Sequence, residues 1–360
     1  MSKREIALVT GGSGYFGTTL VRRLILENYS VRVLDLNYPD NPEPSVEYIV
    51  GDICNIDTCM SATAGVKVVF HNVAQVPLAN NSKKFFDVNI GGTKNICEAS
   101  KRNGVKNFVY TSSSAVYGIP SKLPVMNEDP KIPVEAYGRA KLEGEIICKD
   151  LTNFGIKVKI VRPRTILGLG RLGIFGILFG WVSRGINIYT LGKGDGPYQF
   201  IHAEDLAEGI TRASQLDGNF EFNLGALEYG TFKEDLQRLC DFSKTGSRVI
   251  SLSDWLVRPL LKVLSFIRFL PFASYQLKLY SKPMFFQSEE DWKQLGYIPK
   301  YSNSEMLIES YRHYLESSSS LVTVGVSHHQ KTPKGFSLSA VGLILKLIST
   351  IQNKRTKKPN

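Results

Sequence analysis

The sequence predicts an α/β protein in which a doubly wound parallel sheet is followed by a smaller C-terminal substrate-binding lobe. Two observations carry this prediction: strand-like apolar runs alternate with helix-like stretches over the first 165 residues, and a glycine-rich turn follows the first run. Such alternation is typical of parallel sheets, which bind ligands at the carboxyl ends of their strands. The expected strands are Ile6–Val9, Val31–Asp35, Val46–Val50, Val66–His71, Asn107–Thr111 and Lys157–Val161. The expected helices lie around residues 14–27, 56–64, 83–102 and 135–153.

The first expected strand leads into a Gly-x-x-Gly-x-x-Gly turn, and a helical stretch follows. Residues without Cβ allow the tight reversal and let backbone amides approach a pyrophosphate. The helix N-terminus adds unpaired N–H groups and the positive end of its dipole. The turn therefore predicts a Rossmann-type dinucleotide site. The expected loop contacts to the dinucleotide come from Gly11, Gly14, Tyr15, Phe16 and Gly17.

The second expected strand ends in Asp35, 18 residues beyond Gly17. A carboxylate about 20 residues after the turn bonds the adenosine ribose hydroxyls in dinucleotide sites. It would also repel a 2′-phosphate, and Leu36 and Asn37 follow it in place of a compensating arginine. Arg32 lies three residues upstream within the strand and is expected to point elsewhere. The predicted cofactor is therefore NAD and not NADP.

The third and fourth expected strands also end next to residues suited to the cofactor. Gly51-Asp52-Ile53 follows the third strand, where Asp52 would bond the adenine amine and Ile53 would lie beside the ring. Val73 and Ala74 follow the fourth strand and would line the middle of the cofactor. A polar residue at a strand end is more often a solvated turn, so each of these signals is weak when taken by itself.

The fifth expected strand ends in four hydroxyl residues, Thr111 to Ser114, and a Tyr-x-x-x-Lys pair follows at Tyr137 and Lys141. Residues four apart lie on one face of a helix. A lysine ammonium near a phenol favours the phenolate, whose unperturbed pKa of about 10 then moves toward neutral pH. The phenol can donate or accept a proton while a hydride moves, and a serine from the strand end holds the substrate oxygen.

These motifs resemble the extended short-chain dehydrogenase/reductase superfamily, in its NAD-dependent epimerase/dehydratase group, over roughly residues 4 to 315. The resemblance implies that Ser113 is the catalytic serine, because it stands five positions before the glycine of Tyr117-Gly118. It also implies that Asn89 supports the active-site helix and that Lys141 bonds the nicotinamide ribose. The further markers are Gly51-Asp52, Arg162-Pro163 and His202-x-x-Asp205-Leu206-Ala207.

Two departures from the family bear on the substrate. Sugar-nucleotide dehydratases have Asp-Glu where this chain has Ser114-Ala115, so dehydration is disfavoured. Nucleotide-sugar epimerases usually place a phosphate-binding arginine just before the aromatic-Ile-His stretch. Here that stretch is Tyr198-Gln199-Phe200-Ile201-His202, without the arginine. The remaining arginines that could serve instead are Arg164, Arg171 and Arg184.

Three functions stay open. The first is an NAD-dependent epimerase or dehydrogenase of a sugar or nucleotide sugar. The alternative is a 3β-hydroxysteroid-type dehydrogenase or reductase of a hydrophobic, lipid or sterol-like alcohol. The third is a dinucleotide-sensing protein without chemistry, which the complete set of Ser113, Tyr137 and Lys141 argues against because a sensor needs neither phenol nor serine.

Composition and charge narrow the classes of protein that remain to be considered. Apolar residues make up 43% and charged residues 21% of 360, as is ordinary for a globular protein with a full core. Five cysteines without metal-ligand spacing indicate reduced thiols and no metal site. The net charge is +11, yet residues 321–360 carry seven Lys and Arg and no acid, so the body is only mildly basic and predicts no nucleic-acid partner. No signal peptide is seen and no apolar run reaches 18 residues, which predicts a cytoplasmic protein.

The expected organisation is a dinucleotide-binding core at 1–168, a substrate-binding lobe with some returning core elements at 169–316, a linker at 317–335 and a basic tail at 336–360. Within the lobe, Ile174 to Trp181 is an apolar helical run that suits core packing most simply and a pocket wall as the alternative, 203–215 is helical and 219–224 is a strand. His202 is expected to be a structural histidine at a strand end. Trp255 to Met284 combines five basic with many apolar residues and suits either a helical cap or a lid over a hydrophobic substrate or membrane-facing surface.

The tail joins sixteen mostly apolar residues, 336–351, to four basic residues before position 359. Such a segment suits an interfacial helix attracted to anionic lipid, which predicts peripheral membrane contact through 336–358. A helix that docks on the protein's own surface explains the apolar face equally well, but not the unopposed charge. The partner expected at the active site is a small-molecule substrate, and homodimer formation stays open.

Overall fold

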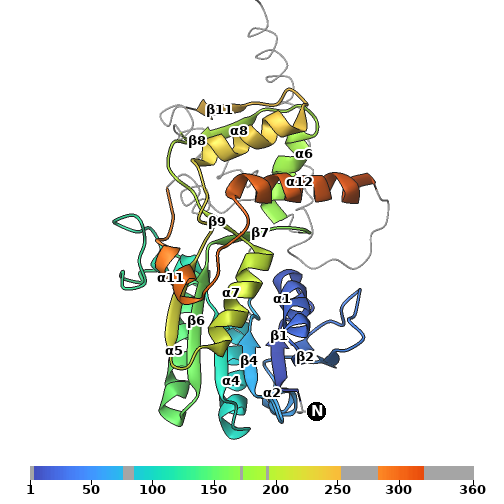
Figure 1. Ribbon diagram of the computed structural model, residues 1–360, viewed down its shortest axis with the longest axis vertical. Coiled ribbons are helices and arrows are strands. Elements are labelled where there is room, and N and C mark those ends of the chain that lie inside the picture. The colour runs from blue at the N-terminus through green and yellow to red at the C-terminus, as the bar shows by residue number, and fades with distance from the viewer. Residues whose placement is uncertain (1–3, 76–84, 171–172, 192–193, 253–282, 320–360) are drawn as a thin grey trace, which may run out of the picture. The chain divides into compact units, whose positions relative to one another are not determined.

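The computed structural model describes residues 4–75, 85–170, 173–191, 194–252 and 283–319 (Figure 1). The chain divides into two compact units. The first unit comprises Met1–Ile166, Ile201–Leu227 and Phe286–Lys300. The second unit comprises Leu167–Phe200, Glu228–Phe285 and Tyr301–Asn360. The chain therefore leaves the first unit and returns to it twice.

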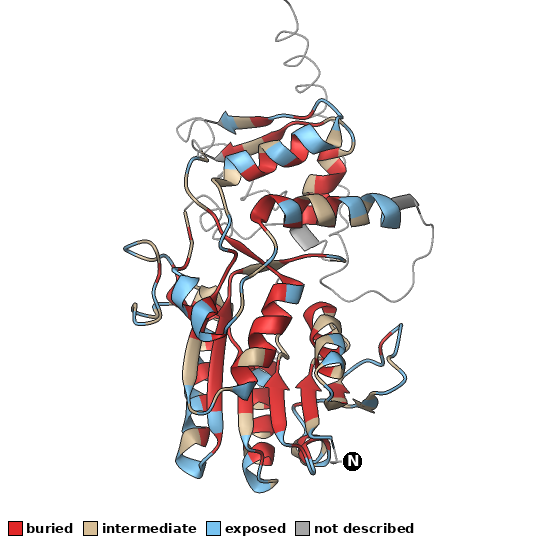
Figure 2. Cartoon of the chain, in the orientation of Figure 1, coloured by how far each residue is buried: buried red, intermediate tan, exposed pale blue. Residues whose placement is uncertain are grey.

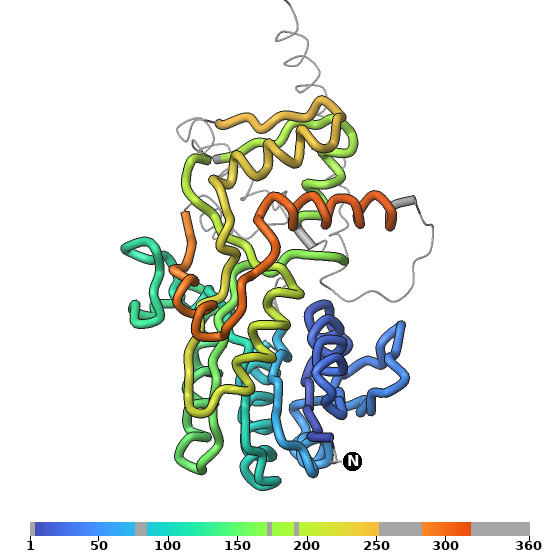
Figure 3. Tube along the Cα trace, in the orientation of Figure 1, coloured from blue at the N-terminus to red at the C-terminus, as the bar shows by residue number. Residues whose placement is uncertain are grey.

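The first unit is built on a seven-stranded sheet in which every pairing is parallel. Its strand order is β10-β6-β5-β4-β1-β2-β3, so β10 from the later chain lies beside β6 (Figure 3). The order reverses between β1 and β4, and doubly wound sheets bind ligands at the carboxyl ends of the strands at such a reversal. The strands are β1 (Ile6–Thr10), β2 (Ser30–Asp35), β3 (Glu47–Val50), β4 (Val68–His71), β5 (Asn107–Thr111), β6 (Lys157–Pro163) and β10 (Phe220–Leu224).

Helices cover both faces of this sheet, and the central strands are buried (Figure 2). One apolar core joins the sheet to α1 (Tyr15–Leu26), α7 (Ala203–Gln215) and Trp292 of α11 (Glu289–Gln294). The other core joins it to α2 (Ile56–Thr63), α4 (Thr93–Arg102) and α5 (Ala136–Lys149). The predicted doubly wound fold is therefore confirmed, including the helix at 203–215 and the strand at 219–224.

Several element boundaries differ from the prediction. The expected helix at 83–102 consists of a π-helix, η1 (Asp87–Gly92), that continues into α4. The expected helix at 135–153 ends its α-helical part at Lys149 and continues as a 3₁₀ turn, η3 (Asp150–Phe154). The sixth strand runs on to Pro163, two residues beyond the expected end.

The second unit contains a two-stranded parallel sheet of β8 (Ile188–Leu191) and β11 (Val249–Leu252). The helices described in it are α6 (Gly173–Val182), α8 (Phe232–Ser243) and α12 (Asn303–Ser319). Phe179 of α6 is fully buried and its ring meets Tyr311 and Tyr314 of α12, so this apolar run serves core packing. Where the chain passes between the units, β7 (Thr165–Leu167) pairs with β9 (Phe200–His202).

Several predicted features fall on residues that are not described. These are most of the basic stretch Trp255 to Met284 and the tail at 336–358. Among the described residues, no helix is both long and apolar enough to cross a membrane.

Candidate functional site

The glycine turn lies between β1 and α1 and is closely packed. Gly11 has φ +72°, a conformation that disfavours side chains, and its N–H donates to Leu34 O at 2.8 Å. A Cβ on Gly17 would overlap the carbonyl oxygen of Gly11. Gly14 is the N-cap of α1 and supplies no side-chain cap, so the first-turn amides are left for another acceptor.

Tyr15 and Phe16 were predicted to contact the cofactor, and their side chains lie in the core on α1. Any contact of these two residues with a phosphate at the turn therefore falls to their backbone amides.

Asp35 ends β2 directly beside this turn. Its Oδ2 accepts the N–H of Ser13 and its Oδ1 accepts the N–H of Asn37, both at 3.1 Å. Partial burial raises the pKa of the Asp35 carboxyl, while these N–H donors oppose the rise. Arg32 points away as expected, because its guanidinium bonds Glu47 and the carbonyls of Ala62 and Ala64.

The residues after β3 and β4 take different positions. Asp52 Oδ1 accepts the N–H of Cys54 at 2.9 Å in a local turn. Ile53 is buried, and a Cβ on Gly92 would lie 2.5 Å from its Cγ2, so Ile53 packs beneath the π-helix. Val73 contacts the glycine turn, since its Cγ2 lies 3.3 Å from a Cβ built on Gly11. Ala74 is half-buried one residue further on.

Asn89 lies in the π-helix and holds the segment after β4. Its Oδ1 accepts the N–H of Gln75 at 2.9 Å and its Nδ2 donates to Gln75 O at 3.0 Å. Both ends of the amide are thus bonded to one backbone unit. π-Helical turns inside helices occur often at functional sites, and this one precedes α4 directly.

A buried hydrogen-bond chain runs beneath these loops. His71, at the end of β4, contacts Thr10 Oγ1 through Nδ1 at 2.7 Å and Thr93 Oγ1 through Nε2 at 2.9 Å. Thr93 Oγ1 in turn donates to Asn89 O at 2.7 Å. Burial, with a smaller contribution from Lys141, lowers the pKa of His71 to about 3, so the imidazole is neutral at pH 7. These hydrogen bonds link β1, which leads into the glycine turn, to the π-helix that carries Asn89.

The three predicted catalytic residues come from two neighbouring elements. Ser113 caps the 3₁₀ turn η2 (Ser114–Tyr117) after β5, and its Oγ accepts the N–H of Ala115 at 3.2 Å. Tyr137 and Lys141 lie one turn apart near the start of α5. A Cβ on Gly138 would overlap the carbonyl oxygen of Ala115, so the residue after Tyr137 sits directly against the Ser113 turn.

Lys141 is buried against β5. Its Nζ donates to Thr111 O at 2.7 Å and lies 4.8 Å from the centre of the Tyr110 ring. Burial lowers the pKa of Lys141 to about 8, and nearby Cys148 and Glu145 oppose that shift. An ammonium with so low a pKa still carries most of its charge at pH 7, in a place where water screens it little.

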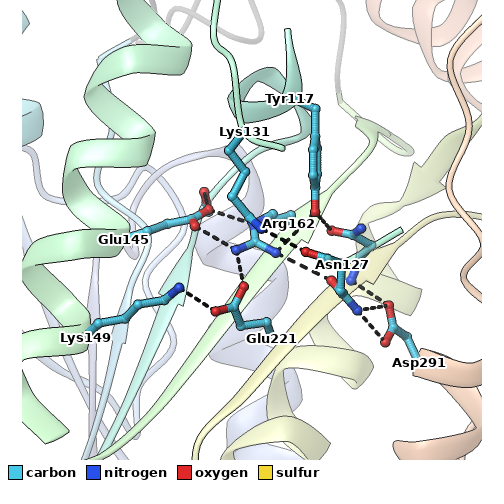
Figure 4. A network of polar contacts seen from close by, with 10 residues as sticks. Tyr117, Asn127, Lys131, Glu145, Lys149, Arg162, Glu221 and Asp291 are labelled. Atoms are coloured by element: carbon cyan, nitrogen blue, oxygen red, sulfur yellow. Dashed lines mark hydrogen bonds and ion pairs between the residues drawn. The ribbon is translucent and has the colours of Figure 1, made fainter. Parts of the chain in front are cut away.

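Sequence reasoning missed a buried polar network behind these elements (Figure 4). At its centre Arg162 of β6 pairs with Glu145 of α5, through Nε–Oε1 at 2.8 Å and Nη2–Oε2 at 2.7 Å. Ser112, next to Ser113, donates to the same Glu145 Oε1 at 2.5 Å. The available signal was the Arg162-Pro163 marker together with an acid four residues after Lys141. The outer members include Tyr117, Asn127, Lys149, Glu221 and Asp291.

Two other residues have defined contacts near the strand ends. His202 is the N-cap of α7, and its Nδ1 accepts the N–H of Glu204 at 3.2 Å, which suits a structural histidine. Arg164 is buried after β6 and donates from Nη1 to Ser114 Oγ at 2.8 Å.

The residues at the glycine turn fit a dinucleotide. A side chain at Gly17 would overlap the backbone of Gly11 and Gly12, and one at Gly11 would press against Val73, so the turn has no room for side chains at these positions. Asp35 lies beside the loop, bonded to the N–H of Ser13, at the position of a ribose-binding acid. Backbone amides that donate to the pyrophosphate and a carboxylate that accepts from the ribose hydroxyls are the groups that NAD requires.

Comparisons with known proteins show the family of the chain. Residues 7–225 match the sequence profile of the NAD dependent epimerase/dehydratase family. The chain is 44% identical over 345 residues to the uncharacterized protein y4nG of Sinorhizobium fredii, covering 96% of this chain and 87% of that protein. It is 29% identical over 221 residues to the decarboxylating sterol-4-alpha-carboxylate 3-dehydrogenase of Mus musculus, covering 60% of each chain.

Among solved structures, the UDP-glucuronic acid 4-epimerase of Bacillus cereus in complex with NAD superposes with a TM-score of 0.69. It is 22% identical and covers 86% of this chain and 99% of that one, so this likeness concerns the fold. The profile match spans more than half of the sequence, from the first strand of the sheet to the last. The chain thus belongs to the NAD-dependent epimerase/dehydratase family.

Proposed function

We propose that this enzyme transfers hydride at a secondary alcohol or ketone with Ser113, Tyr137 and Lys141 as its catalytic residues. Bound NAD supplies the hydride acceptor for an alcohol, or the donor for a ketone when reduced. The Tyr137 phenolate accepts the alcohol proton, and in the reverse direction the Tyr137 phenol returns a proton to the ketone oxygen. Lys141 stabilises the phenolate by its charge, and the Ser113 hydroxyl bonds the substrate oxygen.

The observation that carries this proposal is the buried Lys141 at the start of α5. Its ammonium is anchored on Thr111 O, one helical turn from Tyr137, and burial lowers its pKa to about 8. A buried cation costs solvation free energy, so a purely structural helix gains little by placing one there. A phenol that must ionise near neutral pH does gain from it, because the charge acts in a poorly screened place.

For the substrate we propose first a sugar or nucleotide sugar. The family contains such epimerases, and the UDP-glucuronic acid 4-epimerase shares the fold. The arginine that usually precedes the aromatic-Ile-His stretch is missing, and Tyr198 and Gln199, which precede it here, are both buried. A diphosphate would then need another cation. Arg164 donates to Ser114, Arg184 donates to Gly180 O at 2.6 Å, and Arg171 lies outside the described residues.

The missing arginine favours a second candidate, a 3β-hydroxysteroid-type dehydrogenase or reductase of a hydrophobic alcohol. Such a substrate has no diphosphate and needs no arginine at that position. The 29% identity to the mouse sterol dehydrogenase also supports this candidate.

The two candidates give different products with the same enzyme preparation. UDP-glucose is offered with NAD and followed by the appearance of UDP-galactose, and a 3β-hydroxysteroid is offered with NAD and followed by NADH absorbance. An epimerase regenerates its NAD in each cycle and accumulates no NADH, whereas a dehydrogenase does accumulate it. Thermal-shift screening of sugar nucleotides, sterols and polyprenols extends the test to other members of each class.

Tyr137→Phe tests the catalytic assignment. It should abolish turnover and leave NAD affinity nearly unchanged, because only the proton-transferring oxygen is lost. Lys141→Ala should impair both turnover and NAD binding. Tyr38→Phe, an exposed tyrosine on the loop after β2, is the control and should behave as the wild type. Near-native turnover by Tyr137→Phe would disprove the mechanism.

We also propose that residues 336–358, which lie outside the described part of the chain, contact anionic membranes. The support is their sequence: an apolar run followed by four basic residues, with no acid.

A further inference from the structure

We infer that Glu145 is a positioning residue for this reaction, because with Arg162 it ties the strand end that carries Ser113 to the helix that carries Tyr137 and Lys141. The inference rests on the proposed function, since it takes those three residues as the catalytic set. It adds a residue that touches neither substrate nor cofactor and acts through its neighbours.

The tie is direct on both sides. Ser112 Oγ, one residue before Ser113, donates to Glu145 Oε1 at 2.5 Å. Glu145 itself lies one helical turn beyond Lys141 on α5. Arg162 of β6 then holds both oxygens of the Glu145 carboxylate at 2.8 and 2.7 Å, with side-chain exposures of 0% for Arg162 and 1% for Glu145. The bidentate pair fixes the orientation of the carboxylate as well as its position.

Stability alone does not explain this arrangement. A buried ion pair loses the solvation of two charges, and apolar residues of similar volume often stabilise as well or better. Arg162 also contacts a second acid, Glu221 of β10, whose side chain is 32% exposed and pairs with Lys149 as well. Glu221 balances the charge of Arg162 from the solvent side. It contacts neither the row of serines after β5, Ser112 to Ser114 (the serine row), nor the part of α5 near Lys141. Glu221 therefore provides a matched control.

Glu145 also acts on Lys141 through its charge. Besides Tyr137, one helical turn before it on α5, the groups facing Lys141 are Tyr110 of β5, His71 of β4, and Cys148 and Glu145 of α5. Burial raises the pKa values of Tyr110 and Cys148 and lowers that of His71, so all three are neutral at pH 7. Glu145, in its ion pair with Arg162, is the negative charge among these four groups. Removing it should lower the pKa of Lys141 further below 8.

The test compares Glu145→Gln with Glu221→Gln, using UDP-glucose or the 3β-hydroxysteroid, whichever the wild type converts. Glu145→Gln should lower kcat by about 10- to 100-fold, the range that small misplacements of catalytic groups produce. KM and NAD affinity should change little. The alkaline limb of its kcat–pH profile should move to lower pH, whereas Glu221→Gln should keep both the rate and the profile of the wild type.

A second measurement needs no substrate. A Lys141 pKa below its unfolded value makes the free energy of unfolding rise with pH between the two values. In Glu145→Gln this rise should begin at a lower pH than in wild type or Glu221→Gln. It should disappear when Lys141→Met is added to Glu145→Gln. A structural role for Glu145 would shift the whole curve without moving where the rise begins.

Ser112→Ala keeps the ion pair between Glu145 and Arg162 and removes only the hydrogen bond from Ser112 to Glu145. This variant therefore tests the positioning role if Glu145→Gln does not fold. It should lower kcat and leave the pH profile in place, and a full wild-type kcat would overturn the positioning role. Equal behaviour of Glu145→Gln and Glu221→Gln in both measurements would overturn it too. An active Tyr137→Phe would instead refute the proposed function, and the unfolding measurement would still report on Glu145.

Discussion

At the scale of single residues, one carboxylate governs which dinucleotide fits. Asp35 is fixed beside the glycine turn by the N–H groups of Ser13 and Asn37, so it cannot swing away without leaving both donors unpaired. A ribose with free hydroxyls can donate to it, whereas a 2′-phosphate would bring like charge against it. Arg32 offers no compensation, because it is bonded to Glu47 and two carbonyls on the far side of the strand.

Asp35→Asn should therefore narrow the preference for NADH over NADPH, chiefly by strengthening NADPH binding. The matched control is Asp40→Asn, which removes the same charge from an exposed position on the following loop. Fluorescence titration with both reduced cofactors measures the four affinities. Tighter binding of NADPH than NADH by the wild type would contradict the role given to Asp35.

Because of His71, the free energy of unfolding should fall at acidic pH. Its pKa is about 3 in the folded protein, against about 6.5 unfolded. The unfolded chain therefore binds the proton first, and folding stability falls as pH drops from 6.5 toward 3. The His71→Gln variant lacks this acid-dependent loss. The difference in the free energy of unfolding between wild type and variant should therefore shrink by about 2 kcal/mol between pH 7 and pH 5.

Urea unfolding at both pH values measures that gap. His313→Gln on α12, where the ring is only half-buried, is the control and should track the wild type. A constant gap between His71→Gln and wild type would show that His71 is protonated in the folded state.

Residue spacing predicted those site residues whose role depends on neighbours in sequence. The glycine turn, Asp35 and the pair of Tyr137 and Lys141 follow from distances along the chain. The role of Glu145 does not follow from such distances, because its partners Ser112 and Arg162 are 33 and 17 residues away. Only the order of strands in the sheet brings those three residues together, and the spacing of residues along the chain does not predict that order.

At the scale of elements, the approach of α5 to β5 is set by glycines. A Cβ on Gly144 would overlap Tyr110 Oη, and one on Gly138 would overlap the carbonyl oxygen of Ala115. The helix therefore lies closer to the serine row than any side chain at these positions allows. This contact was not predictable, since both glycines resemble ordinary weak points of a helix in the sequence. Gly92, at the end of the π-helix, likewise lies close to Ile53, a contact that local spacing does not reveal.

Gly138→Ala should push the start of α5 away from the Ser113 turn, and with it Tyr137. We expect kcat to fall about tenfold or more, although alanine favours a helix over glycine. Gly91→Ala is the control, because a Cβ there meets nothing within 4 Å. Steady-state kinetics with a melting curve for each variant separates misplacement from unfolding. Unchanged kcat in Gly138→Ala would show that the close contact has no bearing on catalysis.

At the scale of the whole molecule, the first unit is completed by a segment that returns late in the chain. Trp292 is buried in the core beneath α7, and Asp291 accepts the Nδ2 hydrogens of Asn127 and the N–H of Asn223. Burial raises the pKa of Asp291 to about 6, while these donors oppose the rise. Alternation of strands and helices predicted the sheet, but not this return, because a short helix with an isolated tryptophan has no periodic signal.

The last prediction concerns residues 336–358, whose sequence alone supports it. The apolar run is too short to span a bilayer, so its burial must combine with the attraction of basic residues, about 1 kcal/mol each near an anionic surface. Full-length protein should therefore sediment with phosphatidylserine vesicles and less with neutral ones, and salt should weaken the binding.

A variant ending at Gly335 should stay in the supernatant and keep the melting temperature of the full chain. The rival arrangement, in which the segment docks on the protein itself, buries the apolar face before any membrane arrives. Equal sedimentation of both proteins, or a large loss of thermal stability on truncation, would favour that docking and remove the membrane contact.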